Sequence, residues 1–584
     1  MNISGGIYEV KGCSYILKGY NFCITAPHNS TIELLLYEKD NIGSDADIII
    51  PFEQKYRLGN VWAIRLSNCN LKNYTYNYRI DGAVIADPYS KALTVTSDDI
   101  YRSVIIDNAA YNWEDDKRPK IDYSDMIIYR IHVKGFTCGY ASKVRNKGTY
   151  KAIIEKIPYL KELGITSLEL MPVHEFIDHN PNYWGYAGGY YFSPKMSYSS
   201  DKKPGGQVIE FKNMVKELHK NGIEVIIEQF YAQGTNPSMV IDSIKYWSEE
   251  YHIDGIHIIS YNDVEKIIAE VPELADVKIF GNSWWNIDFS HEYIRDNNNL
   301  IEYNDSFMNT ARMFLKGDEN QVNAFINCFK DNPYNVAKVN YISHTNTFTL
   351  MDMVSYERKH NEANGENNRD GRDYNNSWNC GIEGATRNRK ILALRNRQIK
   401  NALCMLFLSQ SIPMLLSGDE FGNSQSGNNN PYCQDNAISW LDWRMIKKNS
   451  EIFEFVKKLI GFRKKHPVLH QKEQLKLADY KGRGMPDISL HSEKAWYPGM
   501  EIYQRHIGIL LSGLYAFGED GNECDDDIYI AFNMHWEAHS FAIPDQSEEC
   551  EYEVVIYTGE NEVIISNRCV EVEPRSVLVL VHHN

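Results

Sequence analysis

Tyrosine is abundant in this chain, and its phenol ring could contact a ligand. The sequence holds 39 tyrosines against 22 phenylalanines. Phenol rings can stack on the faces of sugar rings, because the contact buries apolar C–H groups and leaves hydroxyl groups in water. A codon bias that also enriches isoleucine, lysine and asparagine explains the same excess, so the count alone assigns no ligand.

Cysteine and acidic residues offer no clear metal or redox site. The eleven cysteines are an odd number, spread thinly and without C-x-x-C pairs. This pattern is typical of reduced thiols and predicts a cytoplasmic protein. No acidic loop has the spacing of a calcium site, so we expect no metal and no cofactor.

The charge balance excludes several classes of partner. The chain has 61 basic and 78 acidic residues, a net charge of −17, with 43% hydrophobic residues. An acidic, well-mixed composition argues against nucleic acid as a partner and against a disordered chain. No signal peptide is visible, and the apolar stretch 403–416 is interrupted by Ser409, Gln410 and Pro413, so no membrane partner is expected.

The order of predicted elements divides the 584 residues into three domains. Residues 1–115 contain short alternating apolar runs, which predict an N-terminal β-sandwich. From 120 to 468, strand-like runs alternate with helical ones, as in the helix 208–222 with Phe211, Met214, Val215 and Leu218 on one face. This alternation favours a closed (β/α)8 TIM barrel. Residues 469–584 return to β patterns and predict a C-terminal antiparallel β-sandwich.

Three long strings are too specific to arise by chance. They are HNEANGENNRDGRDYNNSWNCGIEG (360–384), SIPMLLSGDEFGNSQSGNNNPYCQDNAISWLDW (411–443) and NYWGYAGGYYFSP (182–194). They resemble the α-amylase superfamily, glycoside hydrolase family 13, in its isoamylase, type I pullulanase and glycogen debranching branch. The string YNYRIDGAVIADPYSKAL resembles the family 48 carbohydrate-binding module of such proteins. The resemblance implies the fold class deduced above and an α-glucan, such as glycogen or starch, as ligand.

The resemblance also implies where chemistry would take place. In this family an Asp after the fourth barrel strand attacks the sugar, and a Glu after the fifth protonates the leaving oxygen. An Asp after the seventh strand binds sugar hydroxyls. A retaining mechanism needs these carboxylates because one forms a glycosyl ester while a second, about 5 Å away, holds a proton.

The matching positions in this chain carry no carboxylate. The fourth-strand pattern Gly-Phe-Arg-Phe-Asp aligns with 255–259, which places Ile259 at the nucleophile position and His257 at its arginine neighbour. The acid position is Asn282. The seventh-strand His-Asp pair aligns with Thr345 and Asn346. Isoleucine cannot form a glycosyl ester and an amide has no transferable proton at neutral pH, so we expect a catalytically silent protein.

Other interpretations of the same region stay open. In the third strand Glu228 keeps a carboxylate, while Gln233 replaces the family histidine. An active enzyme that cleaves α-1,6 branches through a relocated site could recruit Glu228 or His257. A shift of register to Asp263 is disfavoured, because Gly255 anchors the alignment. A scaffold whose pocket is plugged and binds no sugar is the third alternative.

The resemblance also implies binding residues and partners. A glucan would contact an aromatic wall and neutral amides. The candidate carbohydrate-binding residues are Tyr183, Trp184, Tyr186, Asn282, Asn346, Arg369 and Asp370. Related isoamylases include silent subunits that pair with an active one, so an active debranching enzyme is a second expected partner.

Overall fold

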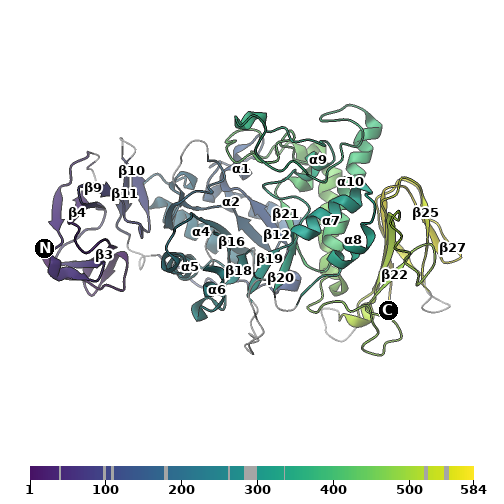
Figure 1. The fold of residues 1–584 in the computed structure, drawn as a ribbon, viewed down its shortest axis with the longest axis horizontal. Coiled ribbons are helices and arrows are strands. Elements are labelled where there is room, and N and C mark those ends of the chain that lie inside the picture. The colour runs from purple at the N-terminus through teal and green to yellow at the C-terminus, as the bar shows by residue number, and fades with distance from the viewer. Residues whose placement is uncertain are drawn as a thin grey trace.

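The computed structural model describes most of the chain. It leaves out residues 39–40, 42, 97–99, 107–110, 177–181, 261–263, 282–283, 285–298, 334–335, 518–523 and 545–550. Three groups of elements follow one another along the molecule, with a parallel barrel in the middle and antiparallel sheets at both ends (Figure 1).

Two antiparallel sheets form the N-terminal part. One sheet has the order β1-β7-β3-β2 with β6 on β7, and the other has the order β10-β11-β8-β4-β5 with β9 on β8. Their inward side chains, such as Phe22, Leu34 and Trp62, make a core of their own. The strands are β1 (Asn2–Gly5), β2 (Gly12–Ile16), β3 (Gly19–Thr25), β4 (Ile32–Tyr37), β5 (Ile48–Pro51), β6 (Arg57–Leu58), β7 (Val61–Ser67), β8 (Thr75–Ile80), β9 (Ala83–Ile85), β10 (Leu93–Val95) and β11 (Tyr101–Val104).

A closed parallel barrel occupies the centre of the molecule. All its strand pairs are parallel, and β12 pairs with β21 to close the ring. Its strands are β12 (Ile128–Ile131), β13 (Ser167–Leu170), β16 (Glu224–Tyr231), β17 (Gly255–Ser260), β18 (Lys278–Gly281), β19 (Leu300–Tyr303), β20 (Ala337–Asn340) and β21 (Ile412–Leu416). A separate hairpin, β14 (His174–Phe176) with β15 (Gly189–Pro194), follows β13.

Helices surround the barrel and bury its outer face. Their bounds are α1 (Val133–Cys138), α2 (Tyr150–Glu155), α3 (Ile157–Leu163), α4 (Gly206–Lys220), α5 (Pro237–Tyr251), α6 (Val264–Ala269), α7 (Asp305–Lys316), α8 (Val322–Phe329), α9 (Leu350–Met353), α10 (Arg389–Leu408), α11 (Met445–Lys448) and α12 (Ser450–Lys465). In α4 the apolar residues at helical spacing are buried, and Gly222 beyond its end has a φ of 73°, which glycine adopts without strain.

Two further antiparallel sheets form the C-terminal part. The larger one has the order β22-β23-β24-β29-β26, and the smaller one has the order β25-β28-β27. Their strands are β22 (Ile488–His491), β23 (His506–Leu511), β24 (Asp527–Asn533), β25 (His539–Ala542), β26 (Glu553–Tyr557), β27 (Ile565–Ser566), β28 (Cys569–Val572) and β29 (Ser576–His582). The predicted fold class, a (β/α)8 barrel between two β-sandwiches, is therefore confirmed.

The larger C-terminal sheet shares its apolar core with the barrel. Phe532 of β24 lies 5.2 Å from Phe325 of α8, measured between ring centroids, and Phe314 of α7 stacks on Phe325. The same buried cluster runs from the barrel strands through these helices into β29. One continuous core thus joins the barrel to the C-terminal sheet.

Two predictions from the sequence concern disulfide bonds and membrane-spanning helices. The ten cysteines that the structure describes form no disulfide bond. Among the described residues, no helix combines the length and the apolar character that a membrane span requires.

Candidate functional site

The carboxyl ends of β16 and β17 bring two pairs of side chains into the barrel. Ile226 of β16 belongs to the barrel's interior cluster, so Glu228 and Phe230, two and four residues further, face the same way. In the parallel register Glu228 pairs with His257 and Phe230 pairs with Ile259. The inner wall therefore carries a polar pair with an apolar pair above it, nearer the barrel mouth.

Arg130 of β12 is the centre of a buried polar cluster at this level. Its guanidinium forms ion pairs with Glu169 of β13 and, at 2.5 Å, with Glu228. It also donates to the Thr345 hydroxyl at 3.0 Å and to the Tyr186 hydroxyl at 3.2 Å. The side chains of Arg130 and both glutamates have no solvent exposure. Arg130 therefore compensates two buried carboxylates, which would be costly to leave unpaired.

Glu169 has further partners that fix its charge. His257 Nδ1 lies 2.9 Å from its carboxylate, and the Tyr303 hydroxyl donates to its other oxygen. Burial would raise the pKa of Glu169, but the Arg130 charge and these hydrogen bonds outweigh it and lower the pKa to about 2. Burial and the Glu169 charge raise the pKa of the Tyr303 phenol, which therefore stays protonated and donates.

This geometry is poorly suited to acid catalysis. A general acid needs a pKa near the working pH, and Glu169 is ionised far below it. Glu228 has no exposed side-chain surface, and its carboxylate is held by Arg130 and by the Tyr186 hydroxyl, which donates at 2.9 Å. The two carboxylates at this level of the described barrel therefore serve the Arg130 cluster rather than face a substrate.

Ile259 lies above the cluster, towards the barrel mouth. It is half-buried, two residues beyond His257 on the inner face of β17. Its pairing partner Phe230 is also half-buried, and the Phe230 ring lies 5.9 Å from the Tyr186 ring. An aliphatic and an aromatic side chain thus separate the buried charges from the mouth.

The predicted residues are brought together only in part. Glu228, His257 and Thr345 gather around Arg130 and Glu169, as described above. Gln233 is exposed, in the loop after β16. Asn346 is exposed as well, and its side-chain oxygen lies 3.1 Å from His344 Nδ1. Asn282 and the alternative Asp263 lie outside the described residues.

The aromatic residues Tyr183, Trp184 and Tyr186 form a packed cluster with Tyr432 and Trp440. Tyr183 and Trp184 are only 7% and 5% exposed, whereas Tyr186 is half-buried. Tyr183 stacks on the His132 ring at 3.9 Å between centroids. Tyr186 therefore has the most accessible ring of the predicted three, and sugar binding by this cluster stays a prediction.

The two charged residues predicted from the 360–384 loop have different surroundings. Arg369 is exposed. One Asp370 oxygen accepts hydrogen bonds from the side-chain amides of Asn364 at 2.7 Å and Asn430 at 3.0 Å. Asp370 Oδ2 therefore ties this loop to the loop 416–443, while Asp370 Oδ1 is buried without a hydrogen-bond partner among the described residues.

Sequence reasoning missed the residues that organise this level of the barrel. Arg130, Glu169 and Tyr303 were not among the predicted site residues, yet they hold Glu228 and His257 in place. The available signal was one charged residue inside an otherwise apolar strand, as in the IYRI of β12 and the SLEL of β13. Such residues are almost never fully buried unless paired.

Comparison with known proteins shows which family the chain resembles. Residues 130–232 match the family described as "Alpha amylase, catalytic domain". The chain is 30% identical to a "Glycogen operon protein GlgX homolog" of Haemophilus influenzae over 552 residues, 76% of this chain and 82% of that protein. It is 29% identical to the homologue of Mycobacterium tuberculosis, over 92% of this chain and 91% of that protein.

Solved structures share the architecture. The catalytic module of the glycogen-degrading pneumococcal virulence factor SpuA superposes with a TM-score of 0.76 at 19% identity, covering 98% of this chain and 97% of that one. Pullulanase from Paenibacillus barengoltzii, in complex with maltohexaose and α-cyclodextrin, superposes with a TM-score of 0.73 at 20% identity, covering 98% and 95%. At these identities the likeness concerns the fold.

The class is therefore that of (β/α)8-barrel proteins with α-amylase-type catalytic domains. The chain belongs to the α-amylase family, glycoside hydrolase family 13, in the branch of GlgX homologues and isoamylases.

Proposed function

We propose that this protein binds α-glucan without hydrolysing it. The observation that carries the proposal is the side chain on the inner face of β17 beyond His257, which is Ile259. An alkyl group cannot form the glycosyl ester that a retaining mechanism requires. In a protease of known mechanism, loss of the nucleophile alone costs about a millionfold in rate.

The electrostatics of the barrel supports a silent site. Glu169 and Glu228 are paired with one buried guanidinium, and the low pKa of Glu169 removes it as a proton donor. Burial and the Glu228 charge raise the pKa of the Tyr186 phenol, so this group remains a neutral donor to Glu228. The half-buried side chain of Tyr186 then leaves ring surface on which a sugar could stack.

The choice of ligand is supported by relatives. GlgX homologues carry the name of a glycogen operon, and the pullulanase neighbour was crystallised with maltohexaose. An α-glucan chain of linked glucose units is therefore the ligand we propose, with Tyr186 and Asn346 as contacts. Tyr183, Trp184, Asn282, Arg369 and Asp370 stay candidate contacts. We further propose a cytoplasmic location and a role as the accessory subunit of an active debranching enzyme.

One observation favours a second candidate function. His257 Nε2 is buried and has no hydrogen-bond partner among the described residues, so this ring has a free polar atom inside the barrel. An active enzyme that cleaves α-1,6 branches through a relocated site would use this nitrogen together with Glu228. This alternative requires access for substrate past Phe230 and Ile259.

Two measurements separate the candidates. Isothermal titration with maltoheptaose and glycogen should show binding that a Tyr186→Ala variant weakens and that a distant Tyr480→Ala control retains. Reducing-end release from glycogen and pullulan should stay at the level of a protein-free blank. Hydrolysis that disappears in Glu228→Gln would establish the relocated site, whereas no binding at millimolar maltoheptaose would leave a scaffold that binds no sugar.

Co-purification tests the partner. A tagged full-length chain, recovered from its native cell, should bring down an active debranching enzyme that releases reducing ends from glycogen. Recovery without any debranching activity would contradict the accessory role while leaving glucan binding unaffected.

A further inference from the structure

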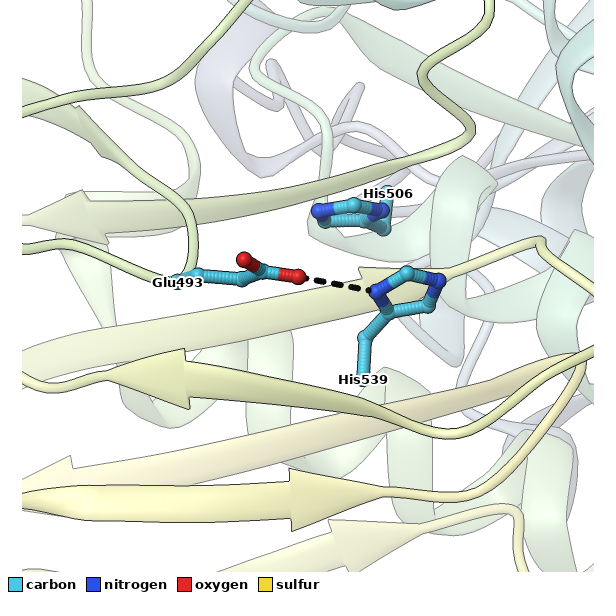
Figure 2. Close-up of side chains that lie close together, drawn as sticks. All are labelled: Glu493, His506 and His539. Carbon is cyan, nitrogen blue, oxygen red and sulfur yellow. Dashed lines mark hydrogen bonds and ion pairs between the residues drawn. The ribbon is translucent and has the colours of Figure 1, made fainter.

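Three side chains with metal-binding groups converge in the C-terminal part, far from the barrel site. Glu493 follows β22, His506 begins β23, and His539 begins β25 (Figure 2). The first two belong to the larger sheet and its connections, whereas β25 belongs to the smaller sheet. The group therefore spans the space between the two sheets of the C-terminal sandwich.

The spacing of the three groups is near that of metal ligands. One ring nitrogen from each histidine and one Glu493 oxygen all lie within 4.8 Å of one another. Bonds of about 2.0 Å in a tetrahedral zinc site place neighbouring ligand atoms roughly 3.3 Å apart. The Glu493 oxygen lies 3.3 Å from His539 Nδ1, whereas a charge-assisted hydrogen bond is typically about 2.7–2.9 Å.

An unpaired ring nitrogen is the second observation. His506 Nδ1 is a buried atom without a hydrogen-bond partner in the described part of the chain. The other nitrogen of His506 lies 3.0 Å from the Ser492 hydroxyl. A histidine that binds a metal usually has its second nitrogen fixed by such a hydrogen bond, which orients the ring.

The two imidazoles also lie against each other. Their rings stack face to face with centroids 4.0 Å apart (Figure 2). One ring comes from the larger sheet and the other from the smaller sheet, so the two sheets bring both ligands to one place.

We propose that Glu493, His506 and His539 bind one zinc-type divalent ion that fastens the two C-terminal sheets together. Two imidazoles and one carboxylate form a donor set suited to zinc, with a fourth position left for water. A cavity of about 310 Å³ adjoins the group and gives access from solvent, and His535 and Glu501 also line it.

A second cluster in the same part of the chain does not carry this argument. His466 Nδ1 lies 2.9 Å from Asp525 Oδ1, and the other Asp525 oxygen accepts the backbone N–H of Val468 at 2.8 Å. These atoms already have protein partners at normal hydrogen-bond distances. These hydrogen bonds account for the cluster as a contact between the end of α12 and the C-terminal part.

Zinc titration of the chelator-treated full-length chain tests the proposal. One equivalent of Zn²⁺ should bind with micromolar or tighter affinity and raise the thermal unfolding midpoint. Glu493→Gln and His539→Ala should each weaken binding at least tenfold and abolish the shift in midpoint. The Glu493 side chain is 62% exposed, so its substitution leaves packing unchanged. Glu501→Gln is the matched control, because Glu501 lines the same cavity and is not one of the three proposed ligands.

Cobalt identifies the ligands. Co²⁺ bound at this site should give the visible absorption of a tetrahedral nitrogen and oxygen site, without the intense ultraviolet charge-transfer band of thiolate ligands. Zinc binding that persists unchanged in both Glu493→Gln and His539→Ala would overturn the proposal. A thiolate band, or no stoichiometric binding at 100-fold metal excess, would overturn it as well.

Discussion

The charge of Glu169 can be removed with little change in shape by Glu169→Gln. Lowering the pKa of this carboxyl from its ordinary 4.5 to about 2 corresponds to about 3 kcal/mol of folding free energy, at about 1.4 kcal/mol per pKa unit. Arg130 keeps Glu228 as a partner in the variant, so no guanidinium is left unpaired. We therefore expect a loss of about 3 kcal/mol at pH 7.

The pH dependence of the unfolding free energy follows from the direction of the Glu169 pKa shift. The folded protein binds this proton more weakly than the unfolded chain, so the stabilisation is complete above about pH 4.5. It is lost as the pH falls from 4.5 towards 2. The difference in unfolding free energy between the wild type and Glu169→Gln should therefore be constant from pH 8 to pH 5 and shrink by more than half at pH 3.

Urea unfolding followed by tryptophan fluorescence measures both effects. Glu273→Gln is the matched control, because Glu273 pairs with Lys245 at 2.9 Å and its side chain is 55% exposed. Exposed pairs contribute little, so this variant should lose no more than about 0.5 kcal/mol. If Glu169→Gln is as mild as Glu273→Gln at pH 7, or if its deficit persists at pH 3, the argument that Arg130 and its partners hold Glu169 ionised is refuted.

Four further predictions rest on the burial and packing of single residues. Ile259→Asp alone should release no reducing ends from pullulan, because a nucleophile without a proton donor completes no hydrolysis; measurable release would contradict the silent site. Burial lowers the pKa of His132 to about 4, so its contribution to stability is lost as the pH falls from 6.5 to 4, and His132→Asn should flatten the urea-measured pH profile there. Gly139→Ala should destabilise the chain by several kcal/mol in thermal or urea unfolding, since its new Cβ would lie 1.9 Å from the Leu441 carbonyl oxygen. Gly461→Ala, at an exposed position of α12 with no atom of the surrounding protein within 4 Å of the new Cβ, should stabilise it by about 0.5–1 kcal/mol in the same assays.

Much of the barrel could be predicted from the sequence, because strand and helix periods alternate clearly. The stretch 150–164, for which the sequence predicts one helix, is divided into α2 and α3. Pro158 at the start of α3 has no N–H to donate to the preceding turn, so the first helix ends at Glu155. The strand β19 (Leu300–Tyr303) was not predicted, since four residues that include Glu302 show no clear alternation.

The Arg130 cluster was harder to predict than the elements that hold it. Arg130, Glu169 and Glu228 belong to three successive barrel strands and lie dozens of residues apart in the sequence. Only closure of the barrel brings these charges together, and local patterns carry no information on which strands become neighbours. Alignment with the family identified Glu228 and His257, because the family's third- and fourth-strand patterns could be aligned with 228–233 and 255–259.

The C-terminal sheet shares its core with the barrel, whereas the N-terminal sheets have a largely separate one, and this difference has an evolutionary consequence. The N-terminal sheets are filled mostly by their own apolar residues, such as Trp62. Ala92 and Val104 join the buried cluster of the barrel, so exchange of this part for another module by recombination would uncover a small area of the barrel. The C-terminal sheet cannot be exchanged so freely, because Phe532 packs on Phe325 and its removal would expose α7 and α8 to water. We therefore expect the barrel and the C-terminal sheets to be inherited together, while the N-terminal sheets vary among relatives.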